Sequence, residues 1–207
     1  MNLREQLERI KRINALADTG LVYSDQGYDR ERYEEIKEIG LHMLADITDQ
    51  PLGKLKDFYM PVEDYPTPKV DVRGLVLNSE NEILMARESE DGKWTIPGGW
   101  ADVGFTASEV IVKEIEEETG LNVSVDRLLA VYDKKCHPHP PQPFYIYKLV
   151  FLCIINDGEL KPSFDILDTA FFGMDNLPEL SEDRILKPQL QQLFKMAMDK
   201  NKVVYFD

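Results

Sequence analysis

The stretch Gly99–Leu121, GWADVGFTASEVIVKEIEEETGL, places four glutamates within five positions: Glu114, Glu116, Glu117 and Glu118. Like charges at neighbouring helical positions repel each other, at a cost of about 0.2–0.5 kcal/mol for each close pair. Two interpretations compete for such a run. It is either a solvated acidic face of a helix or a set of carboxylates gathered to bind divalent cations.

Both ends of this helix are marked in the sequence. Thr106 and Glu109 have the spacing of a capping box, in which each side chain accepts a hydrogen bond from the other residue's backbone amide. Gly120 stands where a left-handed residue commonly ends a helix. The sequence therefore predicts a helix over residues 107–119.

Three of the acids share one face of this helix. At about 100° per residue, Glu114, Glu117 and Glu118 lie together beside a stripe fit for burial, whereas Glu116 points to solvent. The helix also closely follows PGGWADVG, whose glycines allow close approach of the backbone. Clustered carboxylates are the oxygen ligands that Mg²⁺ or Mn²⁺ requires, so the pattern favours a metal site.

The spacing of Gly99, Lys113-Glu114-Ile115 and Glu117–Leu121 resembles the Nudix box, which ends in the run Arg-Glu-apolar-any-Glu-Glu-any-Gly-apolar. Lys113 stands where the family has arginine, and Phe105 where it has its first glutamate. Beyond the box, WTIPGGWADVG, AVYDKKCHPHPP and YKLVFLC resemble a bacterial branch of CDP-choline or ADP-ribose pyrophosphatases. This resemblance covers essentially the whole chain.

The domain organisation follows from changes in pattern along the chain. Apolar residues recur at helical steps in residues 1–60, which predicts a small all-helical N-terminal domain. Its first helix is expected to end near Gly20. Three prolines make residues 61–68 a linker. Residues 69–207 then mix strands and helices, a mixed α/β pattern, and the resemblance implies a Nudix hydrolase domain with the α/β/α sandwich fold.

Several strands are expected in the second domain. KVDVRGLVL and EILMAR flank a polar NSEN turn and predict a hairpin. Further strand candidates are KWTIP, LNVSVDRLLAVYD, FYIYKLVFLCII and TAFFG. The last helix is expected over residues 182–199, with an irregular start because Pro188 interrupts its early turns.

The resemblance assigns roles to individual positions. The metal ligands it implies are the main-chain carbonyl of Gly98 and the carboxylates of Glu114, Glu117 and Glu118. The bound ion, Mg²⁺ or Mn²⁺, would neutralise the diphosphate and lower the pKa of a bound water. Glu114 is the preferred catalytic base, and the alternatives outside the box are the catalytic candidates Asp165 and Asp168 in SFDILDTAFFG.

Three residues are candidates for substrate binding. Arg73 can contact phosphate by a bidentate hydrogen bond, the alternative being a salt bridge on a strand. Trp100 can stack on a base or a ribose. His139 lies in the stiff proline-rich loop CHPHPPQP, which can border the substrate.

The leading hypothesis is a Mg²⁺- or Mn²⁺-dependent pyrophosphohydrolase of a small nucleoside diphosphate linked to a group X, in particular CDP-choline, giving CMP and phosphocholine. ADP-ribose is the nearest alternative substrate. An alternative of another class is a Nudix-fold regulator that senses a nucleotide without hydrolysis, which the departures at Phe105 and Lys113 favour. Retention of the glutamates argues against it.

The bulk properties limit other functions. Net charge is −14, from 24 basic and 38 acidic side chains, which disfavours stable binding of nucleic acid. No apolar run suits a membrane span, the start of the chain does not resemble a signal peptide, and two cysteines form no disulfide framework, so we expect a cytoplasmic protein. The amphipathic N-terminal helices and the resemblance predict a homodimer.

Overall fold

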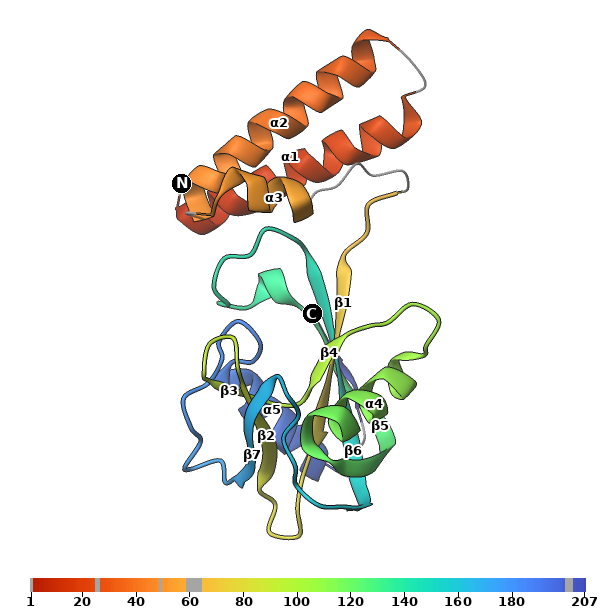
Figure 1. Cartoon of the computed structure of the whole chain (residues 1–207), viewed down its shortest axis with the longest axis vertical. Helices are drawn as coiled ribbons and strands as arrows, with labels where there is room; N and C mark the ends of the chain where they lie inside the picture. Colours follow the sequence, from red (N-terminus) through yellow and green to blue (C-terminus); the bar gives the residue numbers. More distant parts are fainter. Residues whose placement is uncertain (1, 25–26, 49, 59–64, 200–202) are drawn as a thin grey trace. The chain divides into compact units, whose positions relative to one another are not determined.

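The computed structural model describes residues 2–24, 27–48, 50–58, 65–199 and 203–207 (Figure 1). It divides into two compact units, one of Met1–Pro68 with Pro141–Tyr145 and one of Lys69–Pro140 with Ile146–Asp207. Helices come first and a mixed sheet with helices follows, which confirms the predicted fold class. Residues 61–64 of the predicted linker lie outside the described ranges.

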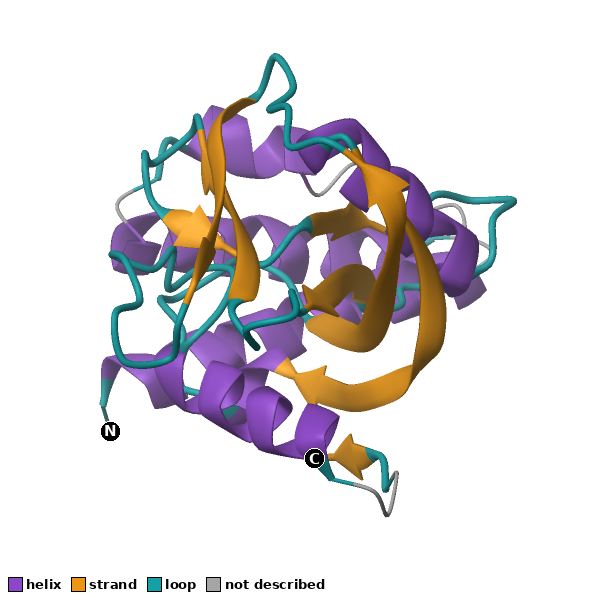
Figure 2. Cartoon of the chain, turned by 90° about the horizontal axis from the view of Figure 1, so that it is seen from below, coloured by secondary structure: helices purple, strands orange, loops and turns teal. Residues whose placement is uncertain are grey.

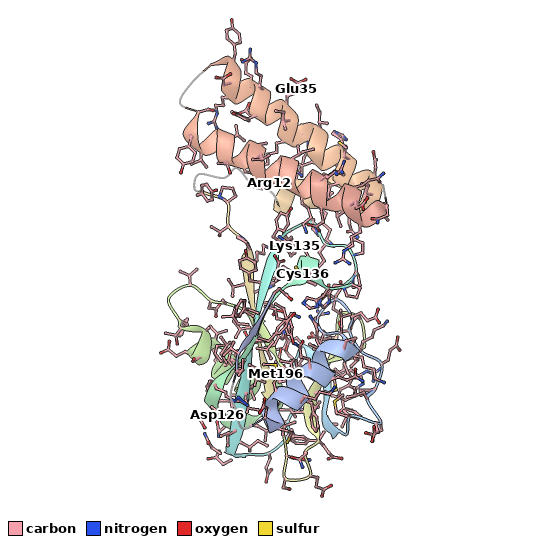
Figure 3. The ribbon with its side chains drawn as sticks, turned by 180° about the vertical axis from the view of Figure 1, so that it is seen from behind. Arg12, Glu35, Asp126, Lys135, Cys136 and Met196 are labelled. Carbon is pink, nitrogen blue, oxygen red and sulfur yellow. The ribbon has the colours of Figure 1, made fainter. Side chains whose placement is uncertain are left out.

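The first unit is a helical hairpin with a short third helix: α1 (Leu3–Tyr23), α2 (Tyr28–Thr48) and α3 (Leu52–Phe58). Asn2 caps α1 through a capping box with Glu5. The buried apolar side chains of the three helices form one cluster: Leu7, Ile10, Leu41, Leu44 and Leu55. Between α1 and α2, Asp18 and Lys37 form a buried ion pair at 2.7 Å, while Arg12 and Glu35 are exposed (Figure 3).

Two expectations for these helices are corrected. The first helix does not end near Gly20 but continues to Tyr23. Gly20 serves close packing and not helix termination, because a Cβ at this position would collide with the Tyr33 ring. The apolar stripes are also wider than the buried core. Ile13 and Ile36, for example, each remain 39% exposed.

Within its described residues, the second unit contains eight strands and two α-helices. Their bounds are β1 (Lys69–Val76), β2 (Ile83–Glu88), β3 (Trp94–Thr95), β4 (Gly98–Trp100), α4 (Ala107–Thr119), β5 (Leu121–Asp133), the 3₁₀ turn η1 (Lys134–Cys136), β6 (Ile146–Gly158), β7 (Ile166–Phe172), α5 (Lys187–Met198) and β8 (Tyr205–Phe206). The strands form a five-stranded sheet of order β4-β1-β6-β5-β8 and a three-stranded sheet of order β3-β2-β7, seen as separate groups in Figure 2.

The predicted hairpin of the first two strands is wrong. Asn78 does organise a tight turn, since its side-chain oxygen accepts from the amides of Glu80 and Glu82. The strands separate beyond a single bridge between Leu77 and Ile83. Strand β1 instead pairs with β4 and β6, and β2 pairs with β3 and β7, so partners distant in sequence place the two strands in different sheets.

Strand β1 places different chemistry on the two faces of the larger sheet. Val72 and Val76 face α4 and share its apolar cluster. Gly74 lies on the same face, and a Cβ there would be 2.6 Å from the Ile115 side chain and 3.1 Å from that of Ile111. Strand alternation turns the side chains of Asp71, Arg73 and Leu75 to the opposite face. Helix α4 therefore lies directly on the backbone of β1.

The last helix begins later than predicted, at Lys187 instead of residue 182. Pro188 lies in its first turn, where a missing amide hydrogen costs nothing. The preceding residues form a loop, in which Ser181 bonds the carbonyl of Trp94 through its amide and Asp91 through its hydroxyl. In the described part of the chain, no helix is long and apolar enough to span a membrane.

Candidate active site

Helix α4 has the bounds and the caps that the sequence predicted. Its bounds are Ala107–Thr119, with a complete Thr106/Glu109 capping box at the start and Gly120 in the left-handed region (φ 76°) at the end. Ile111 and Ile115 are buried against the sheet. Glu118 is buried, Glu114 is half-buried, and Glu116 is exposed.

Two of these carboxylates converge on the glycine pair of β4. The Glu118 Oε2 accepts a hydrogen bond from the Gly98 amide at 2.9 Å. The carboxylate of Glu114 lies so close to Gly99 that a Cβ there would be 2.8–3.0 Å from its atoms. A Cβ on Gly98 would be 2.1 Å from the carbonyl oxygen of Val72. Neither glycine can carry a side chain without displacing part of the site.

Glu117 does not join the other two. Its side chain is 59% exposed and lies 3.9 Å from the Lys113 ammonium, one turn back along the helix. Over the described residues, no group of three or more His, Cys, Asp or Glu side chains is close enough together to hold a metal ion. In this arrangement of side chains the three carboxylates do not converge, and the metal-ligand role of Glu117 stays a prediction.

The electrostatics of the pair still favour a cation. Burial raises the pKa of Glu118 to about 8 against the lowering effects of Arg73 and the Gly98 amide, and the charges of Glu88 and Glu114 add smaller contributions in the same direction as burial. Burial also raises the pKa of Glu114. Two carboxylates that resist ionisation beside a strand of main-chain groups are an oxygen donor set suited to a hard divalent ion.

Arg73 lies beside these carboxylates, on the strand next to β4. It is only 6% exposed, and its guanidinium contacts Asp71 Oδ1 at 2.9 Å, the Ile96 carbonyl at 3.3 Å and Glu88 Oε1 at 3.9 Å. The salt-bridge alternative is thus present, but it is buried. The substrate contact predicted for Arg73 stays a prediction.

The two departures from the Nudix box lie next to each other. The Lys113 ammonium is 3.3 Å from Asp102 Oδ2 and 5.8 Å from the centroid of the Phe105 ring. Asp102 thus supplies the carboxylate partner of Lys113 from the loop that precedes the helix. Trp100, at the end of β4, is 49% exposed, and the Lys69 ammonium lies 5.4 Å from its ring centroid.

The acids outside the box occupy different places. Asp165 is exposed and accepts from the Ser163 hydroxyl, and its charge is among those that raise the pKa of Glu88. Asp168 is exposed on β7, where it accepts from the Thr169 amide and lies opposite Arg87. Asp165 is therefore close to the polar cluster around Arg73, whereas no hydrogen bond or ion pair within the described ranges joins Asp168 to that cluster.

His139 lies apart from the glutamates. Its Nδ1 is 2.6 Å from the carbonyl oxygen of Glu182, in the loop before α5. Burial is the main cause that lowers its pKa to about 3, followed by the charge of Lys148. The side chain is neutral and fixed in orientation.

Sequence reasoning missed three charged neighbours of the site. Asp71 ion-pairs both with Arg73 and with Lys148, whose ammonium is 3.2 Å from Asp71 Oδ2, and Glu88 is half-buried next to Arg73. Signals for two of them were present. Asp71 and Arg73 alternate on one strand face, and Lys148 is a lone charge in the apolar run YIYKLVFLC, which is typical of a buried ion pair.

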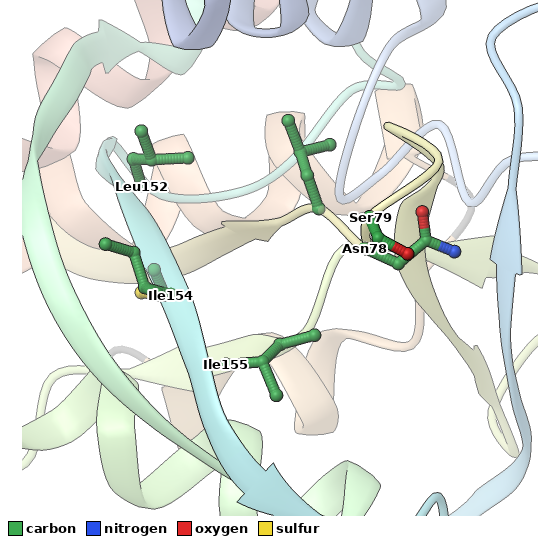
Figure 4. Close-up of a pocket in the computed structure, with 7 residues that line it drawn as sticks. Asn78, Ser79, Leu152, Ile154 and Ile155 are labelled. Atoms are coloured by element: carbon green, nitrogen blue, oxygen red, sulfur yellow. The ribbon is translucent and has the colours of Figure 1, made fainter.

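An open pocket lies elsewhere on the second unit (Figure 4). Its volume is about 560 Å³, and its lining is Leu77, Asn78, Ser79, Leu152, Cys153, Ile154 and Ile155. It adjoins the turn after β1. Along β1 this turn is about five to six residues, or about 15–20 Å, from the residues that pair with Gly98 and Gly99. Its only titratable group is Cys153, whose pKa burial raises to about 12, so the pocket offers no catalytic chemistry.

Comparison with known proteins finds a match for each of the two parts of the chain. Residues 4–59 match the family described as the UDP-X-like, N-terminal oligomerisation domain, and residues 67–193 match the NUDIX domain. The chain is 42% identical over 201 residues to the Bacillus subtilis (strain 168) protein named "Putative ADP-ribose pyrophosphatase YjhB". That alignment covers 97% of this chain and 96% of the relative.

Two solved structures are similar at 33–35% identity. The crystal structure of a UDP-X diphosphatase is 35% identical, with a TM-score of 0.64 and coverage of 100% of both chains. An ADP-ribose pyrophosphatase from Streptococcus suis 89-1591 is 33% identical, with a TM-score of 0.62, and covers 68% of this chain and 100% of its own.

Proposed function

The chain belongs to the Nudix hydrolase family and is a Nudix pyrophosphatase, and from this premise we propose that it cleaves the pyrophosphate of a nucleoside diphosphate linked to a second group X. The products are a nucleoside monophosphate and a phosphorylated X. The observation that carries the proposal is the convergence of Glu114 and Glu118 on the Gly98–Gly99 pair, where both carboxylates have a raised pKa.

Nudix hydrolases generally use divalent metal ions, and the donor set of this chain fits one. Gly98, through its carbonyl, and Glu114, Glu117 and Glu118 would hold Mg²⁺ or Mn²⁺. Such an ion neutralises phosphate charge and lowers the pKa of a bound water. The chain itself supplies the rigid glycine strand, the buried carboxylates, and the helix that keeps them in register with each other.

Glu114 is our preferred base for the attacking water. It is the half-buried member of the pair, and burial raises its pKa toward the range in which a base works best at neutral pH. Asp165 is the second candidate because its charge reaches the same polar cluster through Glu88. Asp168 remains a third candidate from the family resemblance.

Two substrates follow from different observations. CDP-choline, giving CMP and phosphocholine, follows from the resemblance of the whole sequence to that branch of the family. ADP-ribose is supported by the name of the Bacillus subtilis relative, which is similar along nearly its whole length.

Cytoplasmic location and the absence of stable nucleic-acid binding stay predictions from the sequence.

The test is turnover by purified protein of CDP-choline, ADP-ribose and a UDP-sugar, each with Mg²⁺, with Mn²⁺ and with a chelator. We expect metal-dependent release of a nucleoside monophosphate and a phosphorylated X from at least one of them, with the largest kcat/KM for CDP-choline. Lack of turnover of every compound would overturn the proposal. A larger kcat/KM for ADP-ribose would select the second substrate.

We also propose that a second copy of the chain covers an exposed apolar face on the first unit. This face, called here the α1/α2 apolar face, consists of Ile13, Leu16, Ile36, Ile39 and Met43, each 39–53% exposed. In its helix, each of these residues stands immediately before a buried residue. In two antiparallel helices, the residues just before the contact positions point to the same side of the pair, so these five side chains share one face.

The matched N-terminal family supports this choice of partner, since its description names an oligomerisation domain. A monomer that exposed five large apolar side chains on one side of a hairpin would be prone to association. A homodimer buries them and accounts for the apolar stripes that the sequence shows beyond the observed core.

A further inference from the structure

Asp71 is shared by two buried cations on the face of the larger sheet that α5 covers. Its Oδ1 is 2.9 Å from Arg73 Nε and its Oδ2 is 3.2 Å from Lys148 Nζ. Lys148 is 1% exposed, and burial is the main cause that lowers its pKa to about 8. This cluster therefore has more positive than negative charge close to Asp71.

Lys134 adds a third cation at the first residue of η1, immediately after β5. Within the described residues its ammonium forms no hydrogen bond or ion pair. Burial, and next the charge of Lys148, lower its pKa to about 7, against the opposing effect of Asp183 and Asp71. A half-buried ammonium beside another cation is stabilised by any acceptor oxygen that approaches it.

His139 supplies an acceptor in the same cluster. The carbonyl of Glu182 can only accept, so the Nδ1 of His139 carries the proton and donates to it over 2.6 Å. The other ring nitrogen, Nε2, is then an acceptor, and it is enclosed without a hydrogen-bond partner in the structure. The charges of Lys148 and Lys134 both act on this ring.

The strand register places this cluster across the sheet from the glycine pair. Trp100, Asp71, Lys148 and Tyr132 are successive partners on β4, β1, β6 and β5, and Lys134 follows Tyr132 by two residues. With about 4.8 Å between neighbouring strands, the line from β4 to β5 spans about 15 Å. An extended nucleoside diphosphate can cover this span.

We propose that Lys134 binds the part of the substrate beyond the pyrophosphate through an acceptor oxygen, while Nε2 of His139 accepts from a hydrogen-bond donor of the same group. This inference rests on the proposed function. The oxygen belongs either to the carbonyl of a pyrimidine base or to the group X. A quaternary ammonium lacks both a donor and an acceptor and is repelled by the lysines, so a choline group lies outside this subsite.

The test measures binding by calorimetry in Mg²⁺, which requires no hydrolysis. The ligands are CMP and UMP, which carry a base carbonyl, AMP, which lacks one, and ribose 5-phosphate for the X side. We expect Lys134→Met to weaken binding about tenfold, the size expected for one charge-assisted hydrogen bond. If the base supplies the acceptor oxygen, Lys134→Met weakens the binding of CMP and UMP. If the group X supplies it, the variant weakens the binding of ribose 5-phosphate.

The matched control is Lys135→Met, which removes the neighbouring exposed lysine and should leave every affinity within twofold. Lys134→Arg keeps the charge and should retain binding within about threefold. Equal melting temperatures of the variants separate recognition from folding. The proposal is overturned if Lys134→Met leaves all four affinities unchanged, or if the wild-type chain binds none of the ligands. If the hydrolysis assay shows no turnover, the proposed function fails, but the calorimetry still decides whether Lys134 contributes to ligand binding.

Discussion

At the scale of single residues, Glu118 combines burial with a hydrogen bond from the Gly98 amide, and burial dominates its titration. The unfolded chain releases this proton near the ordinary pKa of 4.5 and the folded chain near 8. The folded state therefore binds more protons between these values, and its stability without metal falls as the pH rises through this window.

We expect Glu118→Gln to remove this part of the pH dependence, which amounts to a few kcal/mol in order of magnitude. Urea unfolding in the presence of a chelator at pH 5, 6, 7 and 8 measures it, and Glu116→Gln, at an exposed position, should keep the wild-type slope. Glu118→Gln should also lower kcat/KM by more than about 100-fold, because loss of even an outer-shell partner of a metal costs 10–100-fold. An unchanged slope would contradict the burial argument.

Gly99 is a second residue whose effect is local. A methyl group there meets the mobile end of Glu114, so Gly99→Ala should displace that carboxylate and lower kcat/KM by at least about tenfold. Unfolding free energy should change by less than about 1 kcal/mol, because the side chain can move away. Gly53→Ala is the control, since a Cβ at Gly53 meets nothing within 4 Å. Wild-type activity of Gly99→Ala would show that Glu114 need not lie against the strand.

At the scale of elements, the capping box fixes where α4 begins and therefore where its glutamates lie. Thr106 accepts from the Glu109 amide, and Glu109 accepts from both the amide and the hydroxyl of Thr106. We expect Thr106→Ala to lower the unfolding free energy by about 1 kcal/mol. Urea titration measures this, and Thr106→Ser should recover most of it. If the alanine variant were as stable as wild type, the cap would contribute nothing.

Local signals predicted some elements completely and failed for others. The bounds of α4 and β5 agree with the sequence, because caps and alternation are encoded within each segment. The β1–β2 pairing, the start of α5 and the short strands β4 and β8 were wrong or missed, because partners distant in sequence decide them. The site shows the same division. The face shared by the acids could be predicted, but the orientation of Glu117 depends on Lys113, and the cluster around Asp71 depends on strand register.

At the scale of the whole molecule, the α1/α2 apolar face predicts self-association. We expect Ile39→Glu to shift the chain from dimer to monomer at micromolar concentration, because it places a charge at the most exposed of the five positions. Sedimentation equilibrium measures the change. Glu35→Lys, at an exposed position of the same helix, should remain dimeric. A wild-type chain that sediments as a monomer would refute the assignment.

Gly74 links the architecture of the second unit to its chemistry. Because no methyl group separates β1 from Ile111 and Ile115, the helix that carries the acids rests at the closest distance a backbone allows. Any bulkier residue would lift that helix and carry Glu114 and Glu118 away from their glycines together. A mutational screen scored on turnover would consequently flag this position as strongly as a true ligand, although it has no functional group, and only a measurement of helix displacement would tell the two apart.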